Sequence, residues 1–247
     1  MAGFQQVKIG RSLEFVADAN QERNIKGNPD PEKVCVSYEF TELALDNTNK
    51  YTPYLDTAPS STVASGLGGV LLTTAATDTK TATQTQGGIW WYPAKNPVVE
   101  MKFRIDVITN VAIYAGFSDA VSEASSLLPH GIVDATQTAT AADSAGFLFD
   151  TRQTLSYFNI VNSLAAGAAK AFTQLASTYV PVAATDLTLR VEIDTSGNAK
   201  YYWNGVEVGY KALAVTSTTP LIPFFGIRNN TGTAHIATLR YVRLWQD

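Results

Sequence analysis

Carboxylate side chains near residue 192 have a spacing that glycosidic bond cleavage could use. Glu192 and Asp194 stand two residues apart on one face of a predicted strand, and Glu207 lies across the following hairpin. Glycosidases place two carboxyl groups around the scissile bond. However, no further acid follows three residues after Asp194, so only Glu207 could approach Glu192 and Asp194 from another strand. We favour a solvated outer face on which these acids pair with Lys200 or Arg190. This reading predicts that the chain is not an enzyme and has no catalytic residues.

Two histidines and one cysteine limit the other chemistry that the sequence could support. A Ser–His–Asp arrangement around His130 or His235 stays open, but no Gly-x-Ser-x-Gly motif is present to expose a nucleophile. Neither histidine has a second ligand at zinc-binding spacing. The lone Cys35 has no partner for an intramolecular disulfide. We therefore predict no zinc site.

Calcium is the remaining metal hypothesis, because it takes several oxygen ligands from neighbouring loops. Four aspartates are spread over the region 118–150: Asp119, Asp134, Asp143 and Asp150. No Asp-x-Asp spacing concentrates them, and capping of loops is an ordinary role for Asp. We predict that the chain binds no metal and no cofactor.

Aromatic residues are concentrated in two short segments and are the candidate contact residues. They are Trp90, Trp91, Tyr92, Tyr202 and Trp203. Neighbouring residues of a strand point to opposite faces, so Trp90 and Trp91 cannot both face one core, and the same holds for Tyr202 and Trp203. Exposed Trp and Tyr suit protein interfaces and stacking on sugar rings. The alternative is that an arm or a long loop covers them.

The composition excludes several classes of partner. The 247 residues have a net charge of −4, and only 16% of them are charged, whereas 45% are hydrophobic. No cluster of Lys and Arg exceeds two residues, so a nucleic-acid surface is not expected. No apolar run approaches the roughly 20 residues that span a bilayer, and the N-terminus has no signal-peptide pattern. We predict synthesis in a host cytoplasm, with no nucleic acid and no membrane as partner.

Alternation of apolar and polar residues predicts a protein made of strands. The pattern is clear at 99–107 and at 187–193. We expect 99–107 to form a hairpin with 111–117. Asn204-Gly205 predicts a second tight turn, because both residues tolerate positive φ. Further strands are expected at 34–40, 69–73, 199–203, 206–208, 221–228 and 236–245.

The remaining segments are polar or rich in turn-forming residues. We expect 46–66 to be loop, 77–85 to be an exposed edge or loop, and 120–127 to hold one short helix. Residues 1–33 are predicted to form an extended N-terminal arm with at most one short strand. Residues 34–247 then form a single domain.

The segments 187–208 and 221–245 resemble hairpins of concanavalin A-like, or laminin G-like, jelly-roll domains. In the first segment a strand that ends in Asp194 turns back into the aromatic strand Tyr201-Tyr202-Trp203 and then into Asn204-Gly205. The likeness covers residues 67–247. It implies an all-β fold, an antiparallel jelly-roll β-sandwich with the arm outside it.

The whole chain also resembles virion structural proteins of tailed bacteriophages, which combine such a sandwich with a polar arm and low charge. The resemblance implies a non-catalytic capsid decoration or cement protein that is located in the virion. It would contact the major capsid protein or other virion subunits, as a homo-oligomer such as a trimer. The alternative is a carbohydrate-binding module of a tail fibre or cell-surface protein, with a glycan as its partner.

Overall fold

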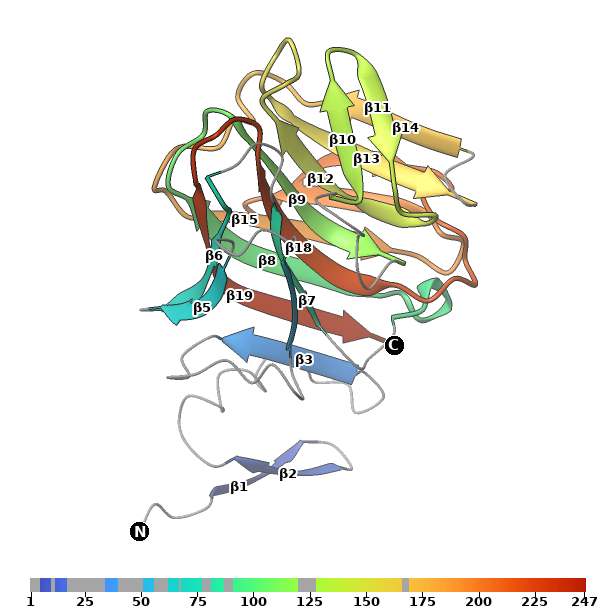
Figure 1. Cartoon of the computed structure of the whole chain (residues 1–247). Coiled ribbons are helices and arrows are strands. Elements are labelled where there is room, and N and C mark those ends of the chain that lie inside the picture. Colours follow the sequence, from blue (N-terminus) through green and yellow to red (C-terminus); the bar gives the residue numbers. More distant parts are fainter. Residues whose placement is uncertain are drawn as a thin grey trace.

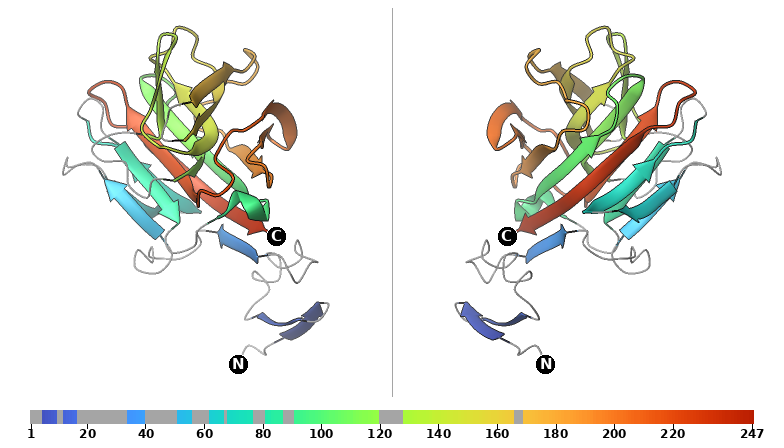
Figure 2. Two further views of the ribbon diagram at one scale, coloured as in Figure 1. Left: turned by 90° about the vertical axis from the view of Figure 1, so that its right-hand side faces the viewer. Right: turned by 90° about the vertical axis from the view of Figure 1, so that its left-hand side faces the viewer.

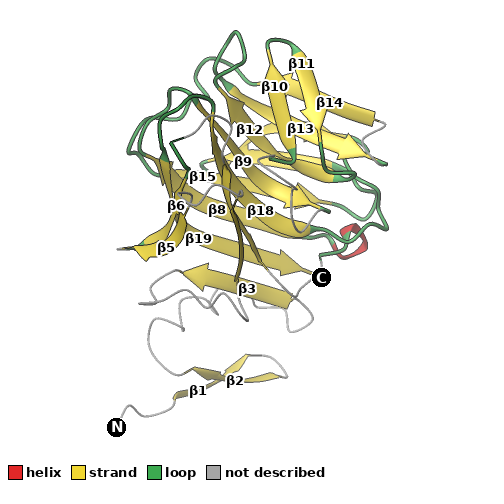
Figure 3. Cartoon of the chain, in the orientation of Figure 1, coloured by secondary structure: helices red, strands yellow, loops and turns green. Residues whose placement is uncertain are grey.

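The computed structural model is built almost entirely of strands (Figures 1 and 3). It describes residues 5–9, 12–16, 34–39, 51–55, 62–66, 68–76, 81–86, 91–119, 128–165 and 169–247. Within these ranges the only helix is a 3₁₀ turn, η1 (Pro93–Lys95). Within the described ranges no helix is long and apolar enough to cross a membrane. The predicted all-β fold is confirmed.

One of the two main sheets has seven strands. They are β4 (Tyr51–Leu55), β7 (Thr81–Gln86), β9 (Val111–Ser118), β12 (Ser144–Asp150), β13 (Phe158–Leu164), β14 (Ala169–Gln174) and β18 (Ile222–Asn229). Their order is β14-β13-β12-β9-β18-β7-β4, and all neighbours are antiparallel.

The other main sheet has eight strands. They are β3 (Val34–Glu39), β5 (Thr62–Gly66), β6 (Gly69–Thr73), β8 (Val98–Ile105), β15 (Leu187–Ile193), β16 (Ala199–Trp203), β17 (Val206–Lys211) and β19 (Ile236–Gln246). Their order is β17-β16-β15-β8-β19-β6-β5. β3 pairs with the second half of β19, and β6 pairs with its first half. The two antiparallel sheets pack as a sandwich (Figure 2).

The main core lies between the two sheets. In β8 and β15 every second side chain is buried and the intervening ones are more exposed, as the alternation predicts. Aromatic rings join the layers: Phe103 of β8 lies 4.8 Å from Phe225 of β18, between ring centroids. Tyr201 of β16 meets Phe147 of β12 edge-on at 5.6 Å. Such pairs add to the stability gained by burying apolar surface.

A hairpin covers the outer face of part of the seven-stranded sheet. It consists of β10 (His130–Val133) and β11 (Thr136–Ala139). A second apolar cluster lies beneath it, formed by Ala112, Tyr114, Leu128, Ile132, Leu148, Val161 and Phe224. β9 is therefore buried along its whole length, on both faces.

The predicted hairpin of 99–107 with 111–117 is wrong. β8 pairs with β15 and β19, whereas β9 pairs with β12 and β18 in the other sheet. The connection 106–110 carries the chain from one layer to the other, and Val107 is exposed beyond the end of β8. The sequence of β9 is apolar at nearly every position because a strand covered on both faces has no reason to alternate.

Two segments predicted as loops contain strands. The segment 46–66 holds β4 and β5, and 77–85 holds most of β7. β7 is not an edge strand, because it pairs with β18 on one side and with β4 on the other. Its Thr-rich sequence has the β-branched side chains that favour extended backbone. The predicted helix at 120–127 lies outside the described residues.

The N-terminal segment holds a small hairpin of its own. β1 (Gln5–Ile9) pairs with β2 (Ser12–Val16). The expectation of at most one short strand in residues 1–33 is therefore wrong. Residues 17–33 lie outside the described residues, so the division of the chain at residue 33 stays a prediction.

Candidate functional site

A β-bulge in β17 sets the direction of one exposed tyrosine. In β16, Tyr201 lies opposite Gly209 and Tyr202 lies opposite Glu207. Val208 therefore has no opposite residue and is the extra residue of the bulge. Val208 packs against the core. Without the extra residue, Tyr210 would point to the same face as Val208. With it, Tyr210 points to the outer face of the eight-stranded sheet, where 53% of it is exposed.

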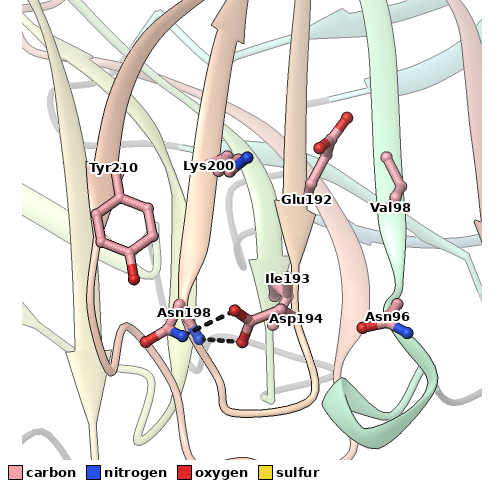
Figure 4. A pocket seen from close by; sticks show the side chains of 8 residues that line it. All are labelled: Asn96, Val98, Glu192, Ile193, Asp194, Asn198, Lys200 and Tyr210. Carbon is pink, nitrogen blue, oxygen red and sulfur yellow. Dashed lines mark hydrogen bonds between the residues drawn. The ribbon is translucent and has the colours of Figure 1, made fainter.

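Tyr210 is the first of four consecutive cross-strand neighbours. It lies opposite Lys200, which lies opposite Glu192, which lies opposite Val98. Directly opposed residues project on the same side of a sheet. This row lines a pocket of about 280 Å³ (Figure 4). The lining residues are Asn96, Val98, Glu192, Ile193, Asp194, Asn198, Lys200 and Tyr210.

The turn between β15 and β16 closes one side of the pocket. The Asp194 carboxylate accepts hydrogen bonds from the backbone N–H groups of Ser196 and Asn198, both at 2.9 Å, and from Asn198 Nδ2 at 2.7 Å. Asn198 Oδ1 in turn accepts the backbone N–H of Leu213. Burial acts to raise the pKa of Asp194, but these hydrogen bonds and the charge of Lys200 lower it overall. Asp194 is therefore a carboxylate that holds the turn.

Glu192 is also held by neighbouring side chains. Its Oε2 accepts the Tyr202 hydroxyl at 3.0 Å, and its Oε1 lies 3.1 Å from Arg190 Nε. The Arg190 guanidinium stacks on the Tyr202 ring at 4.0 Å. Burial, followed by the hydrogen bond to Glu192, raises the pKa of Tyr202. The predicted pairing of Glu192 with Arg190 is present.

The remaining groups of the pocket face its open space. Among the described residues, no hydrogen-bond or ion-pair partner lies against Lys200 Nζ or the Tyr210 hydroxyl. Asn96 uses its Nδ2 to bond Asp247 Oδ2 at 2.7 Å. The pocket thus combines an ammonium group, a phenol and an amide oxygen with the apolar side chain of Val98.

The predicted aromatic candidates that the structure describes have different surroundings. Trp90 is outside the described residues. Trp91 is 1% exposed and exchanges two backbone hydrogen bonds of 2.8 Å with Leu221. Tyr92 is 44% exposed. Since Trp91 is a core residue, it offers no contact surface, whereas Tyr92 does.

The pair Tyr202 and Trp203 divides between the two faces of β16. Tyr202 lies on the outer face, where it holds Glu192. Trp203 packs against the core, with its ring 5.1 Å from Phe158 and 5.6 Å from Tyr179, between centroids. Sequence reasoning missed Tyr210, because counting by twos along 206–210 places it inside. The one signal of the bulge is Gly209, since a glycine within a strand often marks one.

The acidic trio of the glycosidase hypothesis does not form a facing pair of free carboxylates. Glu192 and Asp194 lie on one strand, and both accept hydrogen bonds from neighbouring groups. Glu207 is exposed and lies opposite Tyr202. A general acid would need a raised pKa, whereas that of Asp194 is lowered.

His130 lies in a buried chain of hydrogen bonds with Ser144. His130 Nε2 is 2.6 Å from Ser144 Oγ, which is 2.7 Å from Ser163 Oγ, and Ser163 donates to the carbonyl of Ala141. Gln137 Nε2 lies 3.0 Å from His130 Nδ1 and also donates to a backbone carbonyl. An atom that faces a carbonyl must be the amide nitrogen, so His130 Nδ1 is the acceptor.

The direction of this chain is the opposite of what His130 would need to act as a base for Ser144. With Nδ1 unprotonated, the ring proton sits on Nε2 and is donated to Ser144 Oγ. A general base would have to accept the serine proton instead. Burial and then the charge of Lys170 lower the pKa of His130 to about 3. Among the described residues the side-chain partners of His130 are Ser144 and Gln137 and not a carboxylate, and both His130 and Ser144 are fully buried.

The four aspartates weighed as calcium ligands have different surroundings. Asp150 is buried and pairs with Arg228 and Arg152, both at 2.8 Å. Asp134 is exposed. Asp119 and Asp143 are neighbours, joined by a backbone hydrogen bond of 2.9 Å. In the part of the chain that the structure describes, no three His, Cys, Asp or Glu side chains gather as a metal site.

Comparison with known proteins identifies the fold. No protein-family model and no curated protein matches the sequence. Solved structures match over most of the chain. LamAcat from Zobellia galactanivorans aligns with a TM-score of 0.60 at 10% identity, covering 85% of this chain and 96% of its own. The fold is a concanavalin A-like jelly roll.

Two other jelly rolls show what kinds of protein share this fold. The Bacillus licheniformis β-glucanase aligns with a TM-score of 0.57 at 12% identity, covering 85% of this chain and 97% of its own. The carbohydrate recognition domain of Emp47p aligns with a TM-score of 0.57 at 12% identity, covering 80% and 89%. The jelly roll thus occurs both in an enzyme and in a recognition domain, so the fold by itself does not separate the two.

Proposed function

We propose that the chain is a non-catalytic carbohydrate-binding domain and that the Tyr210 pocket holds its ligand. The observation that carries this proposal is the bulge at Val208, which turns an exposed tyrosine from the core side into a polar pocket. Bulges are frequent where a side chain must be re-aimed for function. An amphipathic ring beside hydrogen-bonding groups suits a sugar, which has both C–H faces and hydroxyl groups.

The groups around Tyr210 match the hydroxyl groups of a sugar. Lys200 supplies donors, Asn96 supplies an amide oxygen, and the ordered turn around Asp194 gives a fixed wall. Preorganised polar groups lower the entropy lost on binding. The fold neighbours support this reading, because a carbohydrate recognition domain and a β-glucanase are among them.

We expect no catalysis because both carboxylates of the pocket are held by hydrogen bonds or ion pairs. Asp194 holds three hydrogen bonds in the turn, and Glu192 is tied to Tyr202 and Arg190. A glycosidase needs one carboxyl group that keeps its proton and another across the scissile bond. The pocket offers neither, so binding without cleavage is the function we propose.

The fold comparisons do not support the virion hypothesis that the sequence suggested. The neighbours described above are a glucanase, LamAcat and a recognition domain, and their names relate to no virion. We therefore take the carbohydrate-binding alternative as the main hypothesis. A capsid partner, a trimer and a place in the virion remain predictions from the sequence.

A glycan array tests the proposal. We expect the wild-type protein to bind a defined subset of glycans and the Tyr210→Ala variant to lose that binding by about tenfold or more, the scale of a lost stacking contact. Val133→Ala, an exposed residue of β10, is the matched control and should bind as the wild type does. The proposal fails if no glycan binds, or if Tyr210→Ala binds them all equally well. Release of reducing sugar from a bound glycan would contradict the non-catalytic part.

A further inference from the structure

The cross-strand row that lines the pocket continues beyond Val98 to a tryptophan of the last strand. Trp245 lies directly opposite Val98 in the pairing of β19 with β8. Because directly opposed side chains share a face, Trp245 projects on the same side of the sheet as the pocket. It is partly exposed, whereas its neighbour Leu244 is buried in the core. Tyr210 and Trp245 therefore stand at the two ends of one cross-strand row.

This row spans five strands, β17, β16, β15, β8 and β19. Strands lie about 4.8 Å apart, so the two aromatic side chains start from backbones separated by about 19 Å. Between them lie Lys200, Glu192 and Val98. The row runs across the strands, and its two aromatic ends are too far apart to contact one small ring.

A second row of side chains, mostly charged, runs beside the first on the same face. Two residues away from the first row on β16, β15, β8 and β19 stand Tyr202, Arg190, Glu100 and Arg243, which are again successive cross-strand neighbours. Arg190 stacks on Tyr202, Tyr202 bonds Glu192, and Tyr241 bonds Glu100 at 2.9 Å. These contacts hold the side chains of the second row in place.

Two Asn–Asp pairs border the row on the other side. Asn198 donates to Asp194 in the β15–β16 turn, and Asn96 donates to Asp247 where η1 meets the end of β19, each at 2.7 Å. The backbone N–H of Asp247 also bonds the carbonyl of Lys95 at 2.7 Å. Figure 2 shows the C-terminus beside η1 in both views. The row thus begins in the pocket at Tyr210 and has an aromatic side chain at each end.

We propose that this face of the eight-stranded sheet binds an extended oligosaccharide chain along the row from Tyr210 to Trp245, rather than a single terminal sugar. The inference rests on the proposed carbohydrate-binding function and names its ligand class. A ligand that is long enough to reach both Tyr210 and Trp245 gains two stacking contacts instead of one. The second contact becomes intramolecular once the first has formed, so affinity rises with chain length until both ends are occupied.

The test is a calorimetric titration with a size series, from the monosaccharide to the hexasaccharide, of a linear glycan that the array identifies. We expect affinity to rise with length and then to level off. Trp245→Ala should bind the short members as the wild type does, but should lose about tenfold in affinity for the long members. Tyr210→Ala should weaken all members. Trp245→Phe, which keeps a ring, should restore most of the length dependence.

The outcomes separate this inference from the proposed function. If the monosaccharide binds as tightly as the hexasaccharide, and Trp245→Ala changes neither, the extended binding site is wrong while the Tyr210 pocket stands. If no member of any series binds, both are wrong. A thermal unfolding measurement shows whether Trp245→Ala is folded. If it is not, affinities that do not rise with ligand length in the wild type and in Trp245→Phe would show that the extended site is wrong.

Discussion

Lys200 and Tyr210 lie directly opposite each other on the outer face of β16 and β17, because Val208 is an extra residue in β17. The residue after the bulge is Gly209, whose position meets the core. A Cβ atom placed on Gly209 would lie 2.7 Å from Ile160 Cδ1. A side chain at position 209 would therefore displace the end of the Ile160 side chain, and glycine avoids this.

Gly209→Ala should destabilise the protein by about 1–3 kcal/mol, the usual cost of an extra group in a packed core. Ile160→Val removes the atom that the new methyl group meets, so the double variant should be less destabilised than the sum of the single variants. Urea denaturation measures all three. Glu207→Ala, on the exposed face of the same strand, is the control. Additive effects would show that Gly209 and Ile160 are not in contact.

Asp150 should be the carboxylate on which stability depends most. It is fully buried and binds Arg228, which is only 4% exposed, as well as Arg152. Asp150→Asn leaves a buried guanidinium without its counter-charge, which costs about 3–5 kcal/mol. Asp186→Asn is the matched control, because Asp186 makes exposed ion pairs worth about 1 kcal/mol or less. Equal unfolding free energies of the two variants would contradict this account.

The same residue predicts a loss of stability in acid. Burial raises the pKa of Asp150, but the hydrogen bond from Arg152 and the charges of both arginines lower it overall. A carboxyl group whose folded pKa is below its unfolded value stabilises the protein above the unfolded pKa, and this contribution disappears as the pH falls through the folded pKa. Wild-type stability should therefore fall below about pH 4, and Asp150→Asn should lack that part of the fall.

His130 should stay neutral, with its proton on Nε2, over the whole physiological range. Burial and then Lys170 lower its pKa to about 3. Between about pH 6.5 and that value the unfolded chain binds the extra proton and the folded protein does not, so stability should fall as the pH falls. Two-bond ¹H–¹⁵N correlation spectra report the tautomer directly, and His235→Gln removes the only other histidine signal. Titration of His130 near pH 6.5, or a proton on Nδ1, would refute the assignment.

The sequence predicts the strands that alternate and misses those that do not. β8, β15 and the turn at Asn204-Gly205 follow from residue pattern and turn chemistry, and positive φ angles of 47° and 84° are present at the turn. The predicted hairpin of β8 with β9 is wrong because these two strands are neighbours in the chain but lie in different sheets. Short-range signals cannot tell a hairpin from a crossing between layers.

The candidate site was predictable only in part. Alternation predicts that Tyr202 and Trp203 take opposite faces and that the acids pair with Lys200 or Arg190, and the structure has Tyr202 outside and Glu192 beside Arg190. The outer position of Tyr210 does not follow from alternation, because a single extra residue reverses which face every later side chain takes. Trp245 joins the row only through the pairing of β19 with β8, which are far apart in the sequence.

A ¹H–¹⁵N correlation titration of the wild-type protein with its best-binding oligosaccharide tests the central claim most directly. It reports which backbone amides meet the ligand. We predict that the largest shifts fall on Lys200, Tyr210 and Asn198 and extend to Trp245 with longer ligands, while the hairpin β10–β11 stays unchanged. Shifts that cluster on the seven-stranded sheet instead, with the Tyr210 row unaffected, would contradict the assignment of the binding site.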